Sequence, residues 1–422
     1  MPPGDITGET GFRAACRRAW RDSAWLRTLA GLAVAVVVWW HSPTVLQDVL
    51  VFGSLLWVLI FRRNRLHGWT SPVGLGFILL LAHMLAMLSF SVHPALSLRD
   101  LTRQLDLVAG MIAIPALFDT PRRLQHALFF SAGALALGFG YDLVRLGYRL
   151  GGRILERAHA YEPFLQNHSN VASMMAGAAA FVFFYFFWLH RRRFWPAVAG
   201  LAGLTLSLAY LVVLASRGPQ IAFAAACCLP GFLAPGRRAK AIWTLLVLLG
   251  GGLLVLGAGA INPRLRDKAS MGTFTERTVV WEHTWKLAQA HPALGYGYGK
   301  RTFEAVYYGS RPPRSSFHYP HCHQYWLKLR FEFGWLGVAL YAGVWGLLAV
   351  SLWRHTFRLP TFTERLLPGT IGMCLAFIHL YGLGDYPDNV VEIMQYALAA
   401  AAVGVLAMPP PATASPPRTP GQ

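Results

Sequence analysis

The sequence has few acidic residues, with 19 Asp and Glu against 38 Lys and Arg, which gives a net charge of +19. It also has little charge overall: 14% of residues are charged, whereas 55% are hydrophobic. This low and clustered charge excludes a soluble globular protein of this length, which would carry more charge, distributed more evenly. Nucleic-acid binding is excluded too, because the basic residues are dispersed among apolar segments and form no single soluble patch.

Cysteine is also scarce, with five residues in 422. Only Cys322 falls in the long polar segment of the chain, so neither a disulfide framework nor a cysteine-based metal site is indicated. The pattern of a cleavable signal peptide is missing as well. The first apolar run begins near Trp25, after a basic stretch, and is followed by a second run, which favours a signal anchor.

Long apolar runs dominate the rest of the sequence, and its mean hydropathy is +0.41. Runs of about 17 to 22 residues are long enough to cross a bilayer. The sequence predicts about twelve such spans: 24–41, 44–61, 71–91, 101–118, 124–143, 170–189, 195–215, 218–235, 241–260, 333–352, 366–384 and 390–408. We therefore expect an all-α polytopic membrane protein.

Basic residues in alternate connections predict the orientation. Arginine clusters follow the spans that end near residues 61, 118, 189, 235 and 352, and the N-terminal arginines fall on the same side. The positive-inside rule makes that side cytoplasmic and places the segment Asn262–Gly337 outside. We expect about nine transmembrane helices in 1–260, a periplasmic loop with amphipathic helices in 261–332, about three helices in 333–408 and a disordered cytoplasmic tail in 409–422.

The outer side of this topology is unusually rich in arginine. Arg145, Arg149, Arg153 and Arg157 recur every four residues, so a continuous helix would place them on one face. Arginines near span ends often extend to lipid headgroups. Alternatively, they bind an anionic substrate, since arginine binds phosphate through paired hydrogen bonds.

Arg217 stands between two apolar spans, in the sequence Ser216-Arg217-Gly218-Pro219. An arginine at the membrane boundary needs an anionic partner. That partner is either a structural carboxylate such as Asp385 or a bound anion. The Gly-Pro pair favours an anion, because it begins a helix whose N-terminus attracts negative charge.

The long polar segment contains three features of interest. Residues 276–288, which include Arg277, have the periodicity of an amphipathic helix. The Gly295–Gly299 stretch, Gly-Tyr-Gly-Tyr-Gly, either binds phosphate or sugar or forms an ordinary turn. The run His318-Tyr319-Pro320-His321-Cys322-His323-Gln324 offers a zinc site or a general base. We favour the base, because the run lacks a helical His-x-x-x-His spacing and a nearby carboxylate cluster.

These residues resemble the motifs of the O-antigen ligase and polymerase superfamily. The matching positions, in order, are Asn170 with Ala172, Ser216-Arg217-Gly218, Arg277 with Trp281, His291-Pro292 with Gly295-Tyr296-Gly297, and His323-Gln324 with Leu327, Glu332, Gly334 and Gly337. The resemblance covers about residues 167–388. The family usually has Asn after the histidine, where this chain has Gln324.

The resemblance implies a GT-C-like, inverting glycosyltransferase that needs neither a metal nor another cofactor. Such enzymes move a glycan from undecaprenyl pyrophosphate to an acceptor at the periplasmic face of the bacterial inner membrane. By the same resemblance, Arg217 and Arg277 bind the pyrophosphate and His323 activates the acceptor hydroxyl. We expect further substrate contacts from Arg145, Arg149, Arg153, Arg157, His318, His321, Asn170 and Arg301. Which of the three neighbouring histidines is the base stays open.

Three activities occur in this superfamily: O-antigen ligase, O-antigen polymerase and protein O-oligosaccharyltransferase. We favour the ligase, whose acceptor is lipid A–core, because that acceptor carries phosphates that the Arg145–Arg157 series suits. Membrane lipids are the other expected partners. A transporter of an anionic solute is a more distant alternative. A transporter places polar residues near the bilayer midplane and often has paired halves, whereas this sequence concentrates its polar residues outside the spans and has no obvious repeat.

Overall fold

The computed structural model describes residues 44–61, 63–102, 104–151, 169–214, 216–229, 272–312, 321–385 and 389–408, with short pieces between them (163, 231, 236–238, 240–242, 244–245 and 319). Several predicted features lie outside these residues: the span 24–41, most of the span 241–260, the tail from residue 409, Arg153, Arg157 and His318. Within the described residues the chain forms helices and no strand, which confirms the all-α class.

The described helices follow the predicted spans closely. The longer ones are α3 (Thr44–Phe61), α4 (Pro72–Ala86), α7 (Pro121–Leu150), α9 (Ser169–His190), α10 (Phe194–Val213), α16 (Tyr325–Arg358), α17 (Phe362–Gly382) and α18 (Asn389–Ala407). The shorter ones are η1 (Arg63–Thr70), η2 (Met87–Phe90), α5 (Pro94–Thr102), α6 (Leu105–Leu117), α11 (Arg217–Ala226), α14 (Gly272–Ala290) and α15 (Lys300–Gly309). The predicted span 101–118 is divided, because α5 ends and α6 begins within it.

Five helical segments in the described part of the chain are long and apolar enough to cross a membrane. They are Pro72–Phe90, Pro121–Leu150, Ser169–His190, Phe194–Val213 and Tyr325–Arg358. These helices support a multi-pass membrane protein. The predicted number of twelve spans and the GT-C-like arrangement stay predictions.

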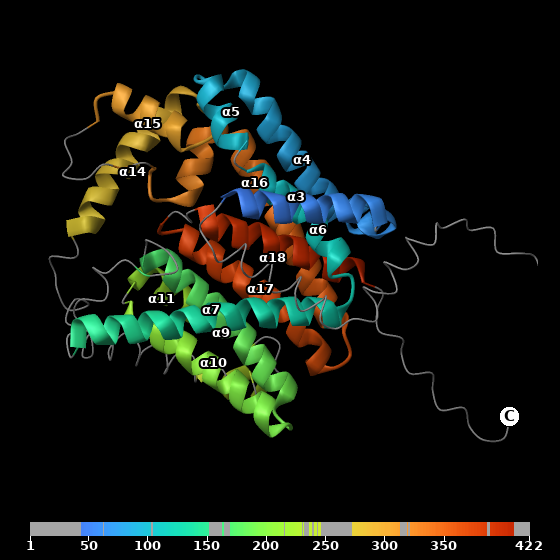
Figure 1. The fold of residues 1–422 in the computed structure, drawn as a ribbon. Coiled ribbons are helices and arrows are strands. Elements are labelled where there is room, and N and C mark those ends of the chain that lie inside the picture. Colours follow the sequence, from blue (N-terminus) through green and yellow to red (C-terminus); the bar gives the residue numbers. More distant parts are fainter. Residues whose placement is uncertain are drawn as a thin grey trace, which may run out of the picture.

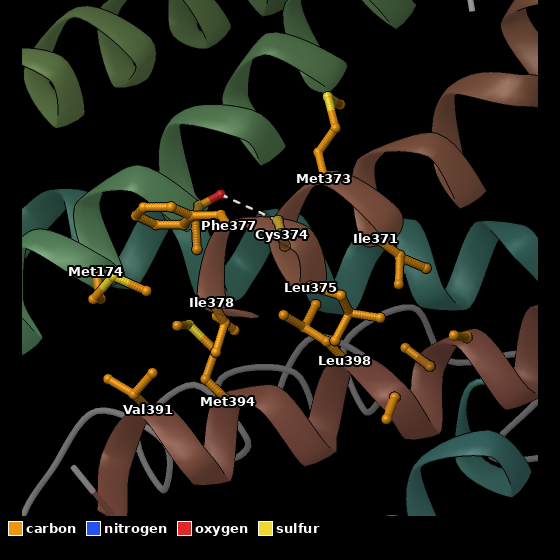
Figure 2. Close-up of a cluster of buried hydrophobic side chains, with 14 of the residues drawn as sticks. Met174, Ile371, Met373, Cys374, Leu375, Phe377, Ile378, Val391, Met394 and Leu398 are labelled. Atoms are coloured by element: carbon orange, nitrogen blue, oxygen red, sulfur yellow. Dashed lines mark hydrogen bonds between the residues drawn. The ribbon is translucent and has the colours of Figure 1, made fainter. Parts of the chain in front are cut away.

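Helix α9 lies at the centre of the bundle and packs against α7, α10, α11 and α17. Its small residues permit this close approach: a side chain at Gly177 would come within 2.5 Å of the Phe377 ring. Helices α17 and α18 complete the core beside it, with Phe377, Ile378 and Met394 packed together (Figure 2). This core supports α17, whose C-terminal end leads to the candidate site.

The polar segment forms a small subdomain at one end of the bundle. Helices α14 and α15 lie together with α5 in the upper part of Figure 1. The structure has a helix over the predicted range 276–288, and Val280, Thr284 and Ala288 of α14 are buried. A separate apolar cluster, which includes Val280, Phe303 and Phe331, joins α14 and α15 to the start of α16.

Helix α16 begins within the predicted loop and breaks at Gly334, whose φ of 61° and ψ of −166° are not helical. The chain from Pro292 to Gly299 fills the break. Trp335 N donates to Pro292 O at 2.8 Å, and Tyr296 N donates to Phe331 O at 2.8 Å. Because a side chain at Gly334 would lie 2.2 Å from Ala293 O, only glycine fits there.

This arrangement decides the role of the Gly295–Gly299 stretch. Its amide groups are already used: Gly297 N donates to Glu332 O at 3.0 Å, and Gly299 N donates to Glu332 Oε1 at 3.0 Å. All three glycines have positive φ, between 73° and 109°. The stretch is therefore a structural turn that braces α16, and its Tyr296, Gly297 and Gly299 amides are not free to bind a phosphate.

Candidate active site

Asp385, just after the end of α17, joins three of the predicted residues. Its carboxylate is nearly buried, at 5% exposure. Oδ1 lies 3.1 Å from His323 Nδ1, whereas Oδ2 accepts hydrogen bonds from Arg277 Nη2 and Asn170 Nδ2, each at 3.1 Å. One carboxylate therefore fixes the positions of His323, Arg277 and Asn170, which come from three distant parts of the chain. We call Asp385 and these three residues the Asp385 hub.

His323 sits in a strained backbone conformation, with a φ of 52°. Such a φ is uncommon outside glycine and costs about 1 kcal/mol or more, so surrounding contacts must enforce it. The ring is about one-fifth exposed. A carboxylate oxygen only accepts hydrogen bonds, so the contact with Asp385 places the proton on Nδ1 and leaves Nε2 with a lone pair. This is the tautomer that a general base requires.

Arg277 projects from the second turn of α14 and is 29% exposed at its side chain. One guanidinium nitrogen, Nη2, is engaged by Asp385. A guanidinium has five N–H groups, so others stay available for an anion. Asn170, in the first turn of α9, donates a hydrogen bond from Nδ2 to the same oxygen of Asp385, Oδ2.

Arg217 is the first residue of α11, and Ser216 before it is buried. Gly218 lies against the ring of Tyr381. A Cβ atom added at Gly218 would be 3.3 Å from this ring. Tyr381 is hydrogen-bonded to Asp385. The N-terminus of α11, with its partial positive charge, therefore begins beside the hub.

His321 and Gln324 flank the candidate base. His321 Nδ1 accepts a hydrogen bond from His323 N at 3.3 Å, which supports the unusual backbone at residue 323. Burial, together with the nearby His323, lowers the pKa of His321 to about 2, so it stays neutral and is a poor base at neutral pH. Gln324 Oε1 accepts from Leu327 N, so this amide caps the N-terminus of α16.

Two of the other predicted residues, Arg145 and Arg301, have carboxylate partners outside the hub. Arg145 lies 3.7 Å from Asp142 on the same helix, and Arg301 Nη1 lies 3.3 Å from Asp100 Oδ1. The second pair ties α15 to α5. Arg149 is in the last turn of α7. Binding roles for these arginines stay predictions, as they do for Arg153, Arg157 and His318.

A second polar cluster is buried in the helix bundle. Lys328 Nζ lies 3.0 Å from Glu392 Oε1 and 3.9 Å from Glu332 Oε2. This cluster ties α16 to α18. Within the described residues, no group of three or more His, Cys, Asp or Glu side chains has the arrangement to hold a metal ion. His318, which belongs to the predicted zinc-site alternative, lies outside the described residues.

From the sequence we interpreted Asp385 only as a structural partner for Arg217. The sequence interpretation therefore missed the central position of Asp385 in the hub. Its one signal was its polarity: Asp385 and Asp388 follow an apolar span at the predicted outer face. The residues that the carboxylate joins are far away in the chain, at 62 positions for His323 and 108 for Arg277.

Comparison with known proteins gave one match to a family model. Residues 202–342 match a family model described as O-antigen ligase. The matched segment contains Arg217, Arg277 and His323, while Asn170 and Asp385 lie on either side of it. No curated protein sequence matched the chain.

Proposed function

We propose, from the premise that this chain belongs to the O-antigen ligase superfamily, that it transfers a glycan from undecaprenyl pyrophosphate to lipid A–core at the periplasmic face of the inner membrane. The observation that carries the proposal is the Asp385 hub. It holds a histidine ring against a carboxylate and beside an arginine, and a base and a cation are the two groups that metal-independent transfer to a hydroxyl needs.

In this mechanism, Nε2 of His323 takes the proton from the acceptor hydroxyl. The acceptor oxygen then bonds to the anomeric carbon of the donor, and the bond from that carbon to the pyrophosphate oxygen breaks. Arg217 and Arg277 stabilise the negative charge that develops on the pyrophosphate. Asp385 keeps Nδ1 protonated and stabilises the imidazolium that forms, as the orienting carboxylate does in other histidine-dependent sites.

The remaining predicted contacts belong to substrate binding in this proposal. Arg145 and Arg149, with Arg153 and Arg157, bind the phosphates of the acceptor at the outer end of α7. His318, His321, Asn170 and Arg301 line or support the site. Replacing the four arginines by Gln in one variant tests this part, because unchanged ligation of purified substrates would show that they do not dock the acceptor.

The test of the function is transfer in vitro, from undecaprenyl pyrophosphate-linked glycan to purified lipid A–core, with EDTA present. We expect transfer by the wild-type protein and a loss of about 10²–10⁴-fold in the His323→Ala variant, since general base catalysis contributes rate factors of about this size. His283→Ala is the matched control: this histidine of α14 hydrogen-bonds Ser310 and lies outside the hub.

Three results would contradict the proposal. Transfer by His323→Ala at the wild-type rate would remove His323 as the base, and loss of wild-type activity on chelation would indicate metal dependence. Elongation of the donor-linked glycan without transfer to lipid A–core would instead identify a polymerase.

A further inference from the structure

Arg330 is a buried cation that the mechanism above does not use. It lies on α16 and is 5% exposed. Its guanidinium lies in the corner between two nearly perpendicular tryptophan rings, with Cζ 3.6 Å from the centroid of Trp285 and 4.5 Å from that of Trp335. Among the residues that the structure describes, no acceptor lies within hydrogen-bonding distance of its Nε or Nη1.

This environment stabilises the charge only in part. Contacts with ring faces contribute about 0.5–2 kcal/mol, whereas an enclosed cation without an anion costs several kcal/mol. Arg330 also lines a cavity, and a guanidinium there can form charge-assisted hydrogen bonds with an oxyanion. Arg330 therefore has the surroundings of a binding residue whose anion is a ligand.

A cavity of about 530 Å³ lies at this arginine. Lys286 supplies a second cation in its lining, and Glu282 is the acidic residue there. Gln324, next to His323, and Leu383, two residues before Asp385, also line it. The cavity lining thus includes chain neighbours of two hub residues, His323 and Asp385.

The same cavity is continuous with apolar surface. Trp335, just after the break in α16, is 51% exposed, and Leu383, just after α17, is 56% exposed. Trp326 and Leu383 also line a second cavity of about 710 Å³, which runs between α11, α16 and α17 and is almost wholly apolar. A ligand that combines an anionic head with hydrocarbon chains fits these two cavities together.

We infer that Arg330, clamped by Trp285 and Trp335, binds a phosphate of the lipid-borne acceptor. The inference rests on the proposed function and names where its second substrate sits. Inverting transfer requires the acceptor and the leaving pyrophosphate on opposite sides of the anomeric carbon. In the proposed function Arg217 and Arg277 take the pyrophosphate side. The Arg330 cavity is lined by Gln324, the chain neighbour of His323, which must contact the acceptor hydroxyl.

The test compares Arg330→Lys with wild type on two acceptors, lipid A–core with its phosphates and the same material after chemical dephosphorylation. Lysine keeps the charge but loses the planar, stacked and bidentate contact. For the phosphorylated acceptor we expect KM to rise about 10-fold or more, with kcat at saturation and KM for the donor within about twofold of wild type. For the dephosphorylated acceptor, wild type and variant should have equal KM values.

Several results would overturn the inference. A rise in KM for the donor would assign Arg330 to the pyrophosphate. An equal effect on both acceptors would show that no acceptor phosphate is bound. An effect that appears only in vesicles containing phosphatidylglycerol, and not in neutral detergent, would assign the site to membrane phospholipid. Arg354→Lys, at the exposed far end of the same helix, is the matched control.

A binding measurement separates this inference from the proposed function. Quenching of tryptophan fluorescence by phosphorylated and dephosphorylated lipid A–core needs no transfer. Preferential binding of the phosphorylated form, weakened in Arg330→Lys, would support the site even if transfer failed. Equal binding of the two forms would overturn it. Thermal unfolding of the variant shows whether it is folded, and Trp285→Phe provides a second perturbation that keeps the charge.

Discussion

Replacing Asp385 by Asn tests whether the carboxylate sets the protonation of His323. The substitution preserves the size of the side chain but makes its two terminal atoms unequal. Both carboxylate oxygens accept hydrogen bonds, whereas an amide has an oxygen that accepts and an NH₂ group that donates. On the Oδ2 side lie two donors, Arg277 Nη2 and Asn170 Nδ2, while one ring nitrogen lies on the Oδ1 side. We therefore expect the amide oxygen to face Arg277 and its NH₂ group to face His323.

An NH₂ group facing Nδ1 makes that nitrogen an acceptor and moves the ring proton to Nε2. The lone pair that would take the acceptor proton is then lost. Removing an orienting carboxylate in this way lowers kcat by up to about 10⁴-fold, which corresponds to about 5 kcal/mol of transition-state stabilisation. We expect Asp385→Asn to lower kcat by about 10²–10⁴-fold, with a smaller change in KM for the donor.

The assay is the initial rate of glycan transfer at saturating donor and acceptor, with thermal unfolding as a check on the fold. Glu304→Gln is a matched carboxylate-to-amide change on α15, outside the hub. If Asp385→Asn keeps a kcat within about threefold of wild type while remaining folded, the tautomer argument is wrong. Asp385 would then be only a structural partner of Arg277.

Two further predictions concern stability. Burial depresses the pKa of His321 to about 2 in the folded protein, whereas a histidine in the unfolded chain has a pKa of about 6.5. Neutral His321 therefore contributes fully to stability above pH 6.5, and this contribution is lost as the pH falls below 6.5 because the unfolded chain then binds a proton. His321→Gln should reduce the loss of unfolding free energy between pH 7 and pH 5 by up to about 2 kcal/mol, and chemical denaturation at both pH values would show an unchanged loss if this is incorrect. Gly334→Ala should destabilise the protein by about 2 kcal/mol or more, because the residue has positive φ and its side chain would meet Ala293 O at 2.2 Å. Gly343→Ala, in the same helix and with open space around it, is the control, and equal melting temperatures for the two variants would refute the prediction.

The sequence alone determined the helical class and the positions of most described spans. Apolar runs at 44–61, 170–189 and 195–215 correspond to α3, α9 and α10 within one or two residues. This works because a segment in lipid must satisfy its own backbone hydrogen bonds and expose apolar side chains, and both requirements are local in the chain. The order of the motifs around Arg217, Arg277 and His323 likewise indicated, without any geometry, the family whose model matches residues 202–342.

Only the tertiary structure decided which of these residues meet. The Asp385 hub depends on how α9, α14 and α17 pack, and no local pattern encodes the partners of a carboxylate that lie 62 to 215 positions away. The same packing turned the Gly295–Gly299 stretch into a brace for the break in α16, because its amides found carbonyl and carboxylate partners there. It also enclosed Arg330 between two tryptophans, where a basic residue in the sequence becomes a candidate binding residue.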